Sequence, residues 1–529
     1  MLRLTTIVLL IGGVLCLASA EDGARYLIVA GDDLVPAAQP LAEWKTAKGM
    51  LAKVVPLSEA GPNPDSVRGF IRQAWNNWPV KPEYVLIAGG PGHIGSPGDI
   101  YDCRYGDVTG DYHVELPVGR LWVRNARECS TIVAKTLAYE RPTLDDTAWF
   151  RSGTTVVRED NDPGDSIYWN DVRTCHSYWQ AAGCLQIDSL SKDRGDSSRH
   201  VDTAANRGTA FVVYRGQCGG NWWPPFNLMD PFTWTNGAKL PVVLGITCAS
   251  ILTEPDWSWF SDKLIRAVSP ATLGGGVAYL GTMLPDGTSP PRSRGLRGFM
   301  HALYLEGEHR LGHAVLQGQH WVDSLFPGQQ RRYEEWALLG DPELGVWTGV
   351  PRRLTVTHDS LISPGPQEFS VAVAGAGRPV CGAHVCVSMD STVYEHDATD
   401  STGTVVLAIA PEYAGVLRVV VTGPNLLPYE GECMVGPTGL LTGRHEITRS
   451  YAVEPRGAWI QYRVGTPGSV KLALFDAAGR EAGLLDEGYR PAGTYRVRFE
   501  PGQLAAGAYT CVLSCRSIAV ARGRLVVCR

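Results

Sequence analysis

In the first part of the chain, short and continuous apolar runs alternate with stretches that have helical periodicity. The segments, in order, are Tyr26–Ala30 (apolar), Pro40–Gly49 (helical), Ala52–Val55 (apolar), Ser66–Trp78 (helical) and Tyr84–Ala88 (apolar). This order predicts a parallel sheet with helices on both of its faces. In such sheets, ligands bind at the carboxyl ends of the strands.

Residues 150–350 continue the same α/β pattern. The predicted strands are Thr154–Val157, Phe211–Tyr214, Val242–Ile246 and Val277–Leu280. The predicted helices include Ser166–Ala182, Phe260–Val268 and Arg294–Leu305.

After Pro351 the pattern changes to short alternating runs separated by turn residues, which is typical of β-sandwiches. The sequence therefore predicts an α/β region followed by two all-β modules of Ig-like type. The expected division is a leader over 1–20, α/β subdomains over 21–145 and 146–350, a sandwich over 351–435, a linker over 436–452 and a second sandwich over 453–529.

Composition limits the function classes. The chain has 529 residues, of which 44% are hydrophobic and 19% charged, so it has enough apolar material for several buried cores. Its 48 Lys and Arg against 54 Asp and Glu give a net charge of −6, so no nucleic-acid partner is expected. Arg3, the apolar run Leu4–Ala18 and the small residues around Ala20 predict a secretory signal cleaved near Ala20. We therefore expect a secreted or surface-located protein.

The chain contains 13 cysteines, and loss of Cys16 with the leader leaves 13 − 1 = 12. An oxidising location would allow disulfides among them. Three local pairs are candidates: Cys381 with Cys386, Cys511 with Cys515, and Cys175 with Cys184. Since no Cys/His spacing fits a zinc site, no structural metal is expected.

Three stretches place reactive side chains after a predicted strand or in an acidic turn. Val242–Ile246 leads to Cys248, which is either a nucleophile or a buried thiol. Phe211–Tyr214 leads into a glycine-rich turn with Gln217 and Cys218. The acidic loop Gly106–Asp111 has oxygen ligands suited to calcium, but it lacks EF-hand spacing, so a solvated turn is the favoured interpretation.

Several motifs, taken in order, resemble the gingipain family of secreted cysteine peptidases. They are Val118-Gly119-Arg120-Leu121, Lys135 with Tyr139-Glu140-Arg141, Asp160-Asn161, Phe211–Gly219, Leu240–Ala249 and Leu339-Gly340-Asp341-Pro342-Glu343-Leu344. The resemblance covers about residues 25–350. It implies a caspase-like fold, cysteine endopeptidase activity on proteins or peptides, and no required cofactor.

The resemblance places Cys248 at the nucleophile position and Gly216 before the catalytic histidine position. That histidine is replaced here by Gln217, whose neutral amide cannot act as a general base. Other histidines in the α/β region could enter the site: His176, His200, His301, His309, His313 and His320. Cys218 is either an alternative thiol or a disulfide partner of Cys248. The rival hypothesis is therefore an inactive relative that binds peptides, glycans or a surface partner.

Two further expectations concern recognition. Trp222 and Trp223 are candidates for an aromatic wall of the substrate cleft, and Asp165 falls near the acid of the family's specificity pocket. Residues 453–529 resemble flagellar hook-capping Ig-like and C-terminal sorting modules of secreted bacterial proteins, which implies export or surface attachment. A monomer is expected.

Overall fold

The structure is a computed structural model of the chain. It describes residues 23–99, 101–159, 163–216, 233–251, 260–266, 273–436, 446–454, 457–465, 468–476, 480–491, 493–499, 504, 507–515 and 518–527. The predicted leader over 1–20, Gln217, Cys218, Trp222 and Trp223 lie outside the described residues. None of the described helices is both long and apolar enough to cross a membrane.

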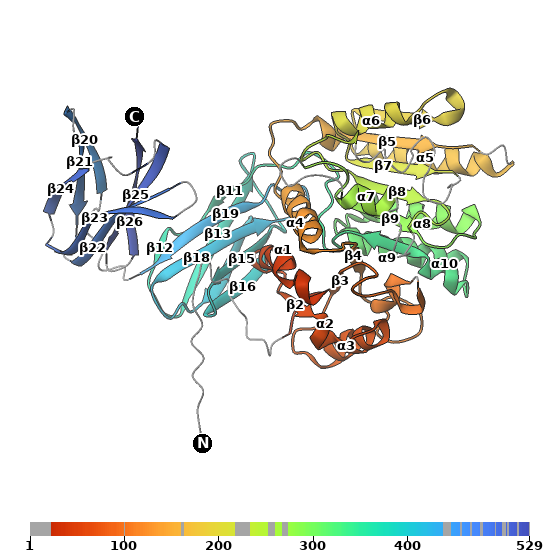
Figure 1. The fold of residues 1–529 in the computed structure, drawn as a ribbon, viewed down its shortest axis with the longest axis horizontal. Helices are drawn as coiled ribbons and strands as arrows, with labels where there is room; N and C mark the ends of the chain where they lie inside the picture. Colours follow the sequence, from red (N-terminus) through yellow and green to blue (C-terminus); the bar gives the residue numbers. More distant parts are fainter. Residues whose placement is uncertain are drawn as a thin grey trace, which may run out of the picture.

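The α/β region is built on one ten-stranded sheet (Figure 1), with strand order β2-β1-β3-β4-β10-β9-β8-β7-β5-β6 within the described residues. The strands are β1 Tyr26–Ala30, β2 Ala52–Pro56, β3 Tyr84–Ala88, β4 Val118–Leu121, β5 Ser152–Val157, β6 Gln186–Ser191, β7 Phe211–Arg215, β8 Val242–Ile246, β9 Ala278–Thr282 and β10 Trp336–Leu339. β7, β8 and β9 pair in parallel, whereas β10 runs antiparallel to β9. The predicted α/β class with a parallel sheet is confirmed, except that β9 and β10 pair in antiparallel fashion.

Helices cover both faces of this sheet. They are α1 Val35–Ala47, α2 Leu57–Ala60, α3 Pro64–Asn77, α4 Ala126–Glu140, α5 Ser166–Ala181, α6 Ser198–Arg207, α7 Phe260–Arg266, α8 Ser289–His301, α9 Leu311–Leu325 and α10 Gln330–Glu334. One core packs α1, α4, α6 and α7 against the sheet, another packs α5, α8 and α9, and a further core packs α2 and α3. Because both faces are covered, strands such as β1, β3 and β8 are buried at every position.

The first sandwich follows directly. Its two sheets have the orders β11-β13-β14, with β17 paired to β13, and β12-β19-β18-β15-β16. The strands are β11 Thr355–Thr357, β12 Leu361–Ile362, β13 Gln367–Gly375, β14 Arg378–Pro379, β15 His384–Met389, β16 Val393–Ala398, β17 Thr404–Ile409, β18 Gly415–Thr422 and β19 Tyr429–Val435. The sandwich contacts the α/β region, where the Tyr394 hydroxyl donates to the Thr46 carbonyl at 3.2 Å.

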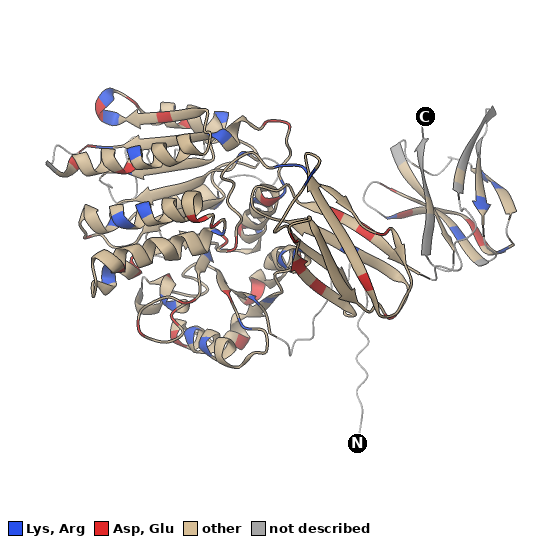
Figure 2. Cartoon of the chain, turned by 180° about the vertical axis from the view of Figure 1, so that it is seen from behind, with Lys and Arg blue, Asp and Glu red and all other residues tan. Residues whose placement is uncertain are grey.

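The C-terminal module has sheets ordered β20-β21-β24 and β23-β22-β25-β26. Its strands are β20 Glu446–Glu454, β21 Gly457–Val464, β22 Gly468–Phe475, β23 Glu481–Arg490, β24 Gly493–Phe499, β25 Gly507–Cys515 and β26 Ile518–Val527. Lys/Arg and Asp/Glu residues are interspersed over the described ribbon (Figure 2).

Two predicted boundaries are wrong. The helix expected from Pro40 begins at Val35, because Pro36 fits the first turn, where its missing N–H costs nothing. The end of the expected linker 436–452 forms the start of β20, whose pairing partner β21 comes later in the chain. The rest of that linker, residues 437–445, lies outside the described residues.

The predictions of three local disulfides are also wrong. Cys381 is an exposed free thiol, while Cys386 lies buried on β15 towards the Thr46 carbonyl. The Cys184 thiol donates to the Arg151 and Gln186 carbonyls, and Cys175 is a free thiol in the core.

Cys511 and Cys515 lie four residues apart on β25. At about 3.3 Å per residue, their Cα atoms are about 13 Å apart. A disulfide needs Cα atoms closer than about 7 Å, so these two cysteines cannot bridge.

Candidate active site

Cys248 lies two residues beyond β8, at the carboxyl edge of the parallel strands, and its side chain is partly exposed. The chain leaves the strand through Ala249, which has a positive φ of 41°. The Ala249 amide donates to the Leu284 carbonyl at 2.8 Å, which fixes this turn. Cys248 is not in a disulfide.

A buried guanidinium contacts the thiol. Arg292 Nη1 donates to Cys248 Sγ at 2.9 Å, and Arg292 Nη2 donates to Glu335 Oε2 at 2.6 Å. Arg292 also donates to the Leu284 carbonyl at 3.1 Å. Arg292 lies in the first half of α8, and Glu335 directly precedes β10. Because β10 runs antiparallel to β9, its amino end lies at the same sheet edge as Cys248.

The environment explains two shifted pKa values. Burial disfavours the charged guanidinium of Arg292, but Glu335 and Cys248 outweigh burial and raise its pKa. Burial raises the pKa of Glu335, and the opposing effect of Arg292 does not cancel it. Both side chains are held away from water, and the Arg292 guanidinium lies between the Glu335 carboxyl group and the Cys248 sulfur.

A second buried network lies beside the first. Arg215, at the end of β7, donates to Asp171 Oδ2 at 2.8 Å and to Ser293 Oγ at 3.0 Å, and it also donates to the Ile246 carbonyl. Ser293 donates to Asp171 at 2.6 Å. Ser293 follows Arg292 on α8, so consecutive residues of this helix fasten the ends of β7 and β8.

Gly216 directly precedes the Gln217 position, and its backbone requires glycine. Its φ is 148°, and a Cβ atom there would lie 2.5 Å from the Arg158 carbonyl oxygen. The Gly216 carbonyl accepts a hydrogen bond from the Thr247 hydroxyl, next to Cys248. The structure thus brings Gly216 and Cys248 to neighbouring strand ends.

Asp165 ends a short 3-10 turn, Pro163–Asp165, directly before α5. Tyr168, in the first turn of α5, receives a hydrogen bond from Ser289 at the start of α8, at 3.4 Å. Asp165 therefore precedes a helix whose start lies beside the start of α8, the helix that carries Arg292.

The alternative bases lie elsewhere. His176 contacts the Thr155 hydroxyl at 2.9 Å, His301 pairs with Glu306 at 3.1 Å, and His313 contacts the Tyr84 hydroxyl at 3.2 Å. His200 caps α6, and His320 stacks on Tyr333. Among the described residues, no histidine side chain forms a hydrogen bond with Cys248, whose thiol contacts Arg292.

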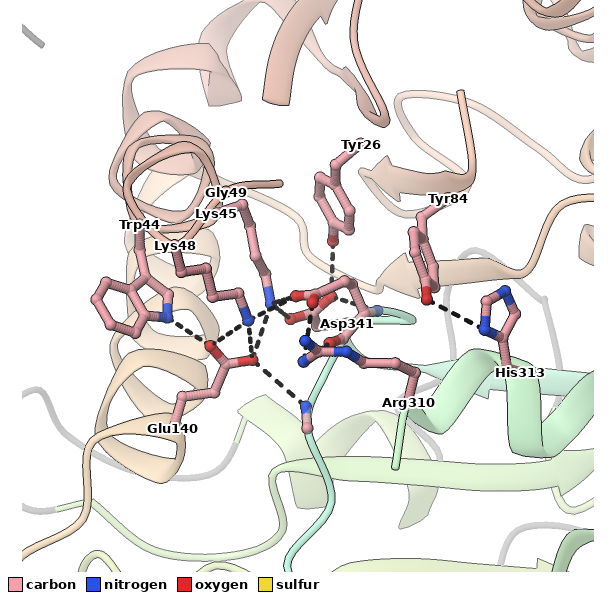
Figure 3. Close-up of polar contacts among 12 residues, drawn as sticks. Tyr26, Trp44, Lys45, Lys48, Gly49, Tyr84, Glu140, Arg310, His313 and Asp341 are labelled. Carbon is pink, nitrogen blue, oxygen red and sulfur yellow. Dashed lines mark hydrogen bonds and ion pairs between the residues drawn. The ribbon is translucent and has the colours of Figure 1, made fainter. Parts of the chain in front are cut away.

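Other motif residues build a different site, shown in Figure 3. Three carboxylates and three cations meet there, all of them buried except for a partly exposed Arg310: Lys45, Lys48, Glu140, Arg310, Asp341 and Glu343. Lys45 lies 2.9 Å from Glu140 and 2.6 Å from Glu343, and it also pairs with Asp341. We call these six residues the closed cluster. The carboxylates lie close enough to share a metal ion, but the ammonium and guanidinium groups already neutralise them.

The acidic loop is held by an arginine. Asp107 is buried, accepts from Arg68 Nη2 at 2.6 Å and accepts from the Gly110 amide at 2.5 Å. A cavity of roughly 180 Å³ lies between the α/β region and the first sandwich, lined by residues such as Trp44, Trp347 and Pro424. Cys248 does not line that cavity.

Comparison with known proteins decides the family. The model of peptidase family C25 matches residues 19–347, which is more than half of the chain. The chain belongs to peptidase family C25. Gingipain R2 of Porphyromonas gingivalis is 22% identical over 378 residues, covering 66% of this chain and 50% of that protein. Lys-gingipain of the same organism is 22% identical over 459 residues, covering 78% of this chain and 26% of that protein.

The chain thus spans about half the length of Gingipain R2, or less for Lys-gingipain. The fold agrees with a crystal structure of the Arg-specific cysteine proteinase gingipain R, with a TM-score of 0.70 and 20% identity. That match covers 80% of this chain and all of the other. These findings confirm the predicted gingipain-like family and fold.

Sequence reasoning missed Arg292, Glu335, Arg215 and Asp171. A signal existed for two of them: Arg215 closes a strand that is otherwise apolar or aromatic, and Glu335 directly precedes the apolar strand β10. Arg292 carried no such signal, because its contact with Cys248 depends on how α8 packs.

Proposed function

We propose that this C25-family chain is a cysteine endopeptidase that hydrolyses peptide bonds through Cys248, without a cofactor. The observation that carries the proposal is the partly exposed thiol at the carboxyl edge of β8, in contact with a guanidinium. Cysteine is nucleophilic as its thiolate, and a neighbouring cation favours that form.

In this mechanism Cys248 Sγ attacks the scissile carbonyl and forms a tetrahedral intermediate. Backbone amides of Gly216 and Cys248 would hold the oxyanion. The Ala249 amide donates to the Leu284 carbonyl, so it does not serve as an oxyanion donor. Collapse of the intermediate expels the amine, and water then hydrolyses the thioester.

The leaving amine must gain a proton. Gln217 cannot supply it, so water would, at a cost of about 10²–10⁴-fold in rate relative to a histidine-assisted site. We therefore expect slow turnover. Asp165, together with Trp222 and Trp223, would bind the substrate, with a preference for a basic P1 residue.

The other parts of the proposal concern location. Residues 1–20 would direct export and be cleaved near Ala20, and the C-terminal module would attach the protein to an outer surface. The chain would act as a monomer on protein or peptide substrates.

The test is cleavage of a mixed peptide library by the purified protein, with and without reductant. Cys248→Ala should abolish cleavage, and Cys381→Ala, which removes an exposed thiol in the first sandwich, should not change it. Unchanged cleavage by Cys248→Ala would overturn the proposal.

The second candidate function is peptide binding without catalysis, and Gln217 at the histidine position favours it. A folded protein that cleaves no library peptide but binds some of them saturably would support this candidate.

A further inference from the structure

Cys248, Arg292 and Glu335 come from three separate elements. Cys248 follows β8, Arg292 lies on α8 and Glu335 precedes β10. Arg292 is 2% exposed and Glu335 is not exposed at all, whereas Cys248 is partly exposed. Of these three side chains, the Cys248 thiol is therefore the one that solvent and substrate can reach.

The guanidinium is held in one orientation. Nε and Nη2 both donate to Glu335 Oε2, at 3.2 and 2.6 Å, and Nη2 also donates to the Leu284 carbonyl. Only Nη1 is directed to the sulfur. A fixed cation of this kind costs little reorganisation when negative charge appears on the sulfur.

Glu335 and Cys248 compete for the same positive charge. An ionised Glu335 neutralises much of the guanidinium charge, and this leaves less for the sulfur. A second cation, Arg332, lies 3.8 Å from Glu335 Oε2, beyond hydrogen-bond distance. Oε1 of Glu335 is buried and has no hydrogen-bond partner in the described structure, so the carboxylate is incompletely stabilised. Burial also raises the pKa of Glu335, which agrees with an incompletely stabilised carboxylate.

We infer that Arg292 and Glu335 are positioning residues that set the reactivity of Cys248 in opposite directions. Arg292 stabilises the thiolate in the absence of a histidine at position 217, and Glu335 limits that effect. The inference rests on the proposed function in taking Cys248 as the nucleophile. It concerns only thiol ionisation, so it can be tested without peptide cleavage.

The experiment measures alkylation of each cysteine by iodoacetamide in the whole protein, by peptide mapping over a pH series. Arg292→Gln should slow alkylation of Cys248 about tenfold at pH 7 and move its pH profile to higher pH. Glu335→Gln keeps an acceptor for Arg292 but removes the charge, so it should speed alkylation several-fold.

The molecule supplies its own controls. Exposed Cys381 gives a reference rate, and buried Cys103 and Cys129 become reactive if a variant loses its fold. Arg294→Gln is the matched variant, because Arg294 lies on the same helix but donates to the Trp321 carbonyl.

The opposite signs decide the outcome. A loss of reactivity in both variants, with Cys103 and Cys129 still protected, would mean a purely structural pair and overturn the inference. Equal pH profiles in Arg292→Gln and the unmodified protein would also overturn it. If the profiles shift as expected but no peptide is cleaved, the inference stands and the proposed peptidase function fails.

Discussion

Two buried ionic networks lie at opposite ends of β10, and they differ in how they end. The closed cluster, beyond the carboxyl end of β10, balances three cations with three carboxylates. The network at the amino end passes from Glu335 through Arg292 to the partly exposed Cys248. Ionic groups that neutralise each other completely hold a structure together, whereas a network that stops at a reactive atom can change its chemistry.

Two of the family motifs contribute to the closed cluster, but none of the motifs contains Arg292 or Glu335. Tyr139-Glu140-Arg141 and Gly340-Asp341-Pro342-Glu343 supply the three carboxylates of the closed cluster, so these motifs identify the family through residues that hold the fold. Arg292, which contacts the thiol, and Glu335, which holds Arg292, lie outside all of the family motifs. A family match therefore says more about the scaffold than about the state of its active site.

The largest effect is expected from Lys45→Met. This change leaves Glu140, Asp341 and Glu343 with too little positive charge in a buried site, so the free energy of unfolding should fall by about 3–5 kcal/mol. Chemical denaturation measures it, with exposed Lys192→Met as the control. Cys248 alkylation should stay unchanged under native conditions; a large change would remove the distinction between the two networks.

Asp171→Asn should affect stability and chemistry together. Asp171 is fully buried and accepts from Arg215 and Ser293, so its loss leaves the Arg215 charge uncompensated. We expect a loss of about 3 kcal/mol in the free energy of unfolding and slower peptide cleavage. The surface variant Asp146→Asn should change neither the free energy of unfolding nor peptide cleavage. Full activity in Asp171→Asn would mean that the Arg215–Asp171–Ser293 network does not influence the chemistry of Cys248.

Acid should weaken the closed cluster. Burial alone would raise the pKa of Glu343, but Arg310, Lys45 and Lys48 outweigh burial and lower it to about 2, from an ordinary value of 4.5. Between these two values the unfolded chain binds the proton and the folded chain does not. The stabilisation is therefore complete above pH 4.5 and is lost as the pH falls towards 2.

Denaturation at several pH values across that window should show a shallower decline for Glu343→Gln than for the unmodified protein. Glu395→Gln, on an exposed position of β16, is the control. Parallel curves for Glu343→Gln and the unmodified protein would contradict the expected role of Glu343.

The smallest effect on stability is expected from Gly216→Ala. A Cβ atom would meet the Arg158 carbonyl at 2.5 Å and a positive φ would have to persist, which costs about 2 kcal/mol. Peptide cleavage should fall as well, because the turn beside Cys248 would shift. Gly69→Ala is the control, since a Cβ atom there meets no atom within 4 Å. Unchanged cleavage in Gly216→Ala would mean that this turn does not shape the site.

The sequence was a good guide where structure is local. Strands β1 and β3 match their predicted bounds, because each is a continuous apolar run between turns. The position of Cys248 after β8 could be predicted for the same reason. Arg292 and Glu335 follow Cys248 by 292 − 248 = 44 and 335 − 248 = 87 residues. Their contacts depend on the packing of α8 and β10, which no local pattern reveals.

The cysteines show the opposite error. Short spacing between Cys381 and Cys386 favoured a disulfide, but spacing contains no information about side-chain direction. The Cys386 sulfur lies 3.9 Å from the Thr46 carbonyl oxygen on α1, and Cys381 is an exposed free thiol. Cys511 and Cys515 fail for a geometric reason, since an extended strand separates them.

The place of β10 in the sheet also has a consequence for biosynthesis. β10 lies between β4 and β9 in the sheet, although it is the last of the ten strands to be made. A ribosome that has completed Cys248 and α8 has not yet delivered Glu335 or the residues that complete the closed cluster. The nascent chain therefore carries its thiol in an unfinished sheet, and both ionic networks close in the same late step of synthesis.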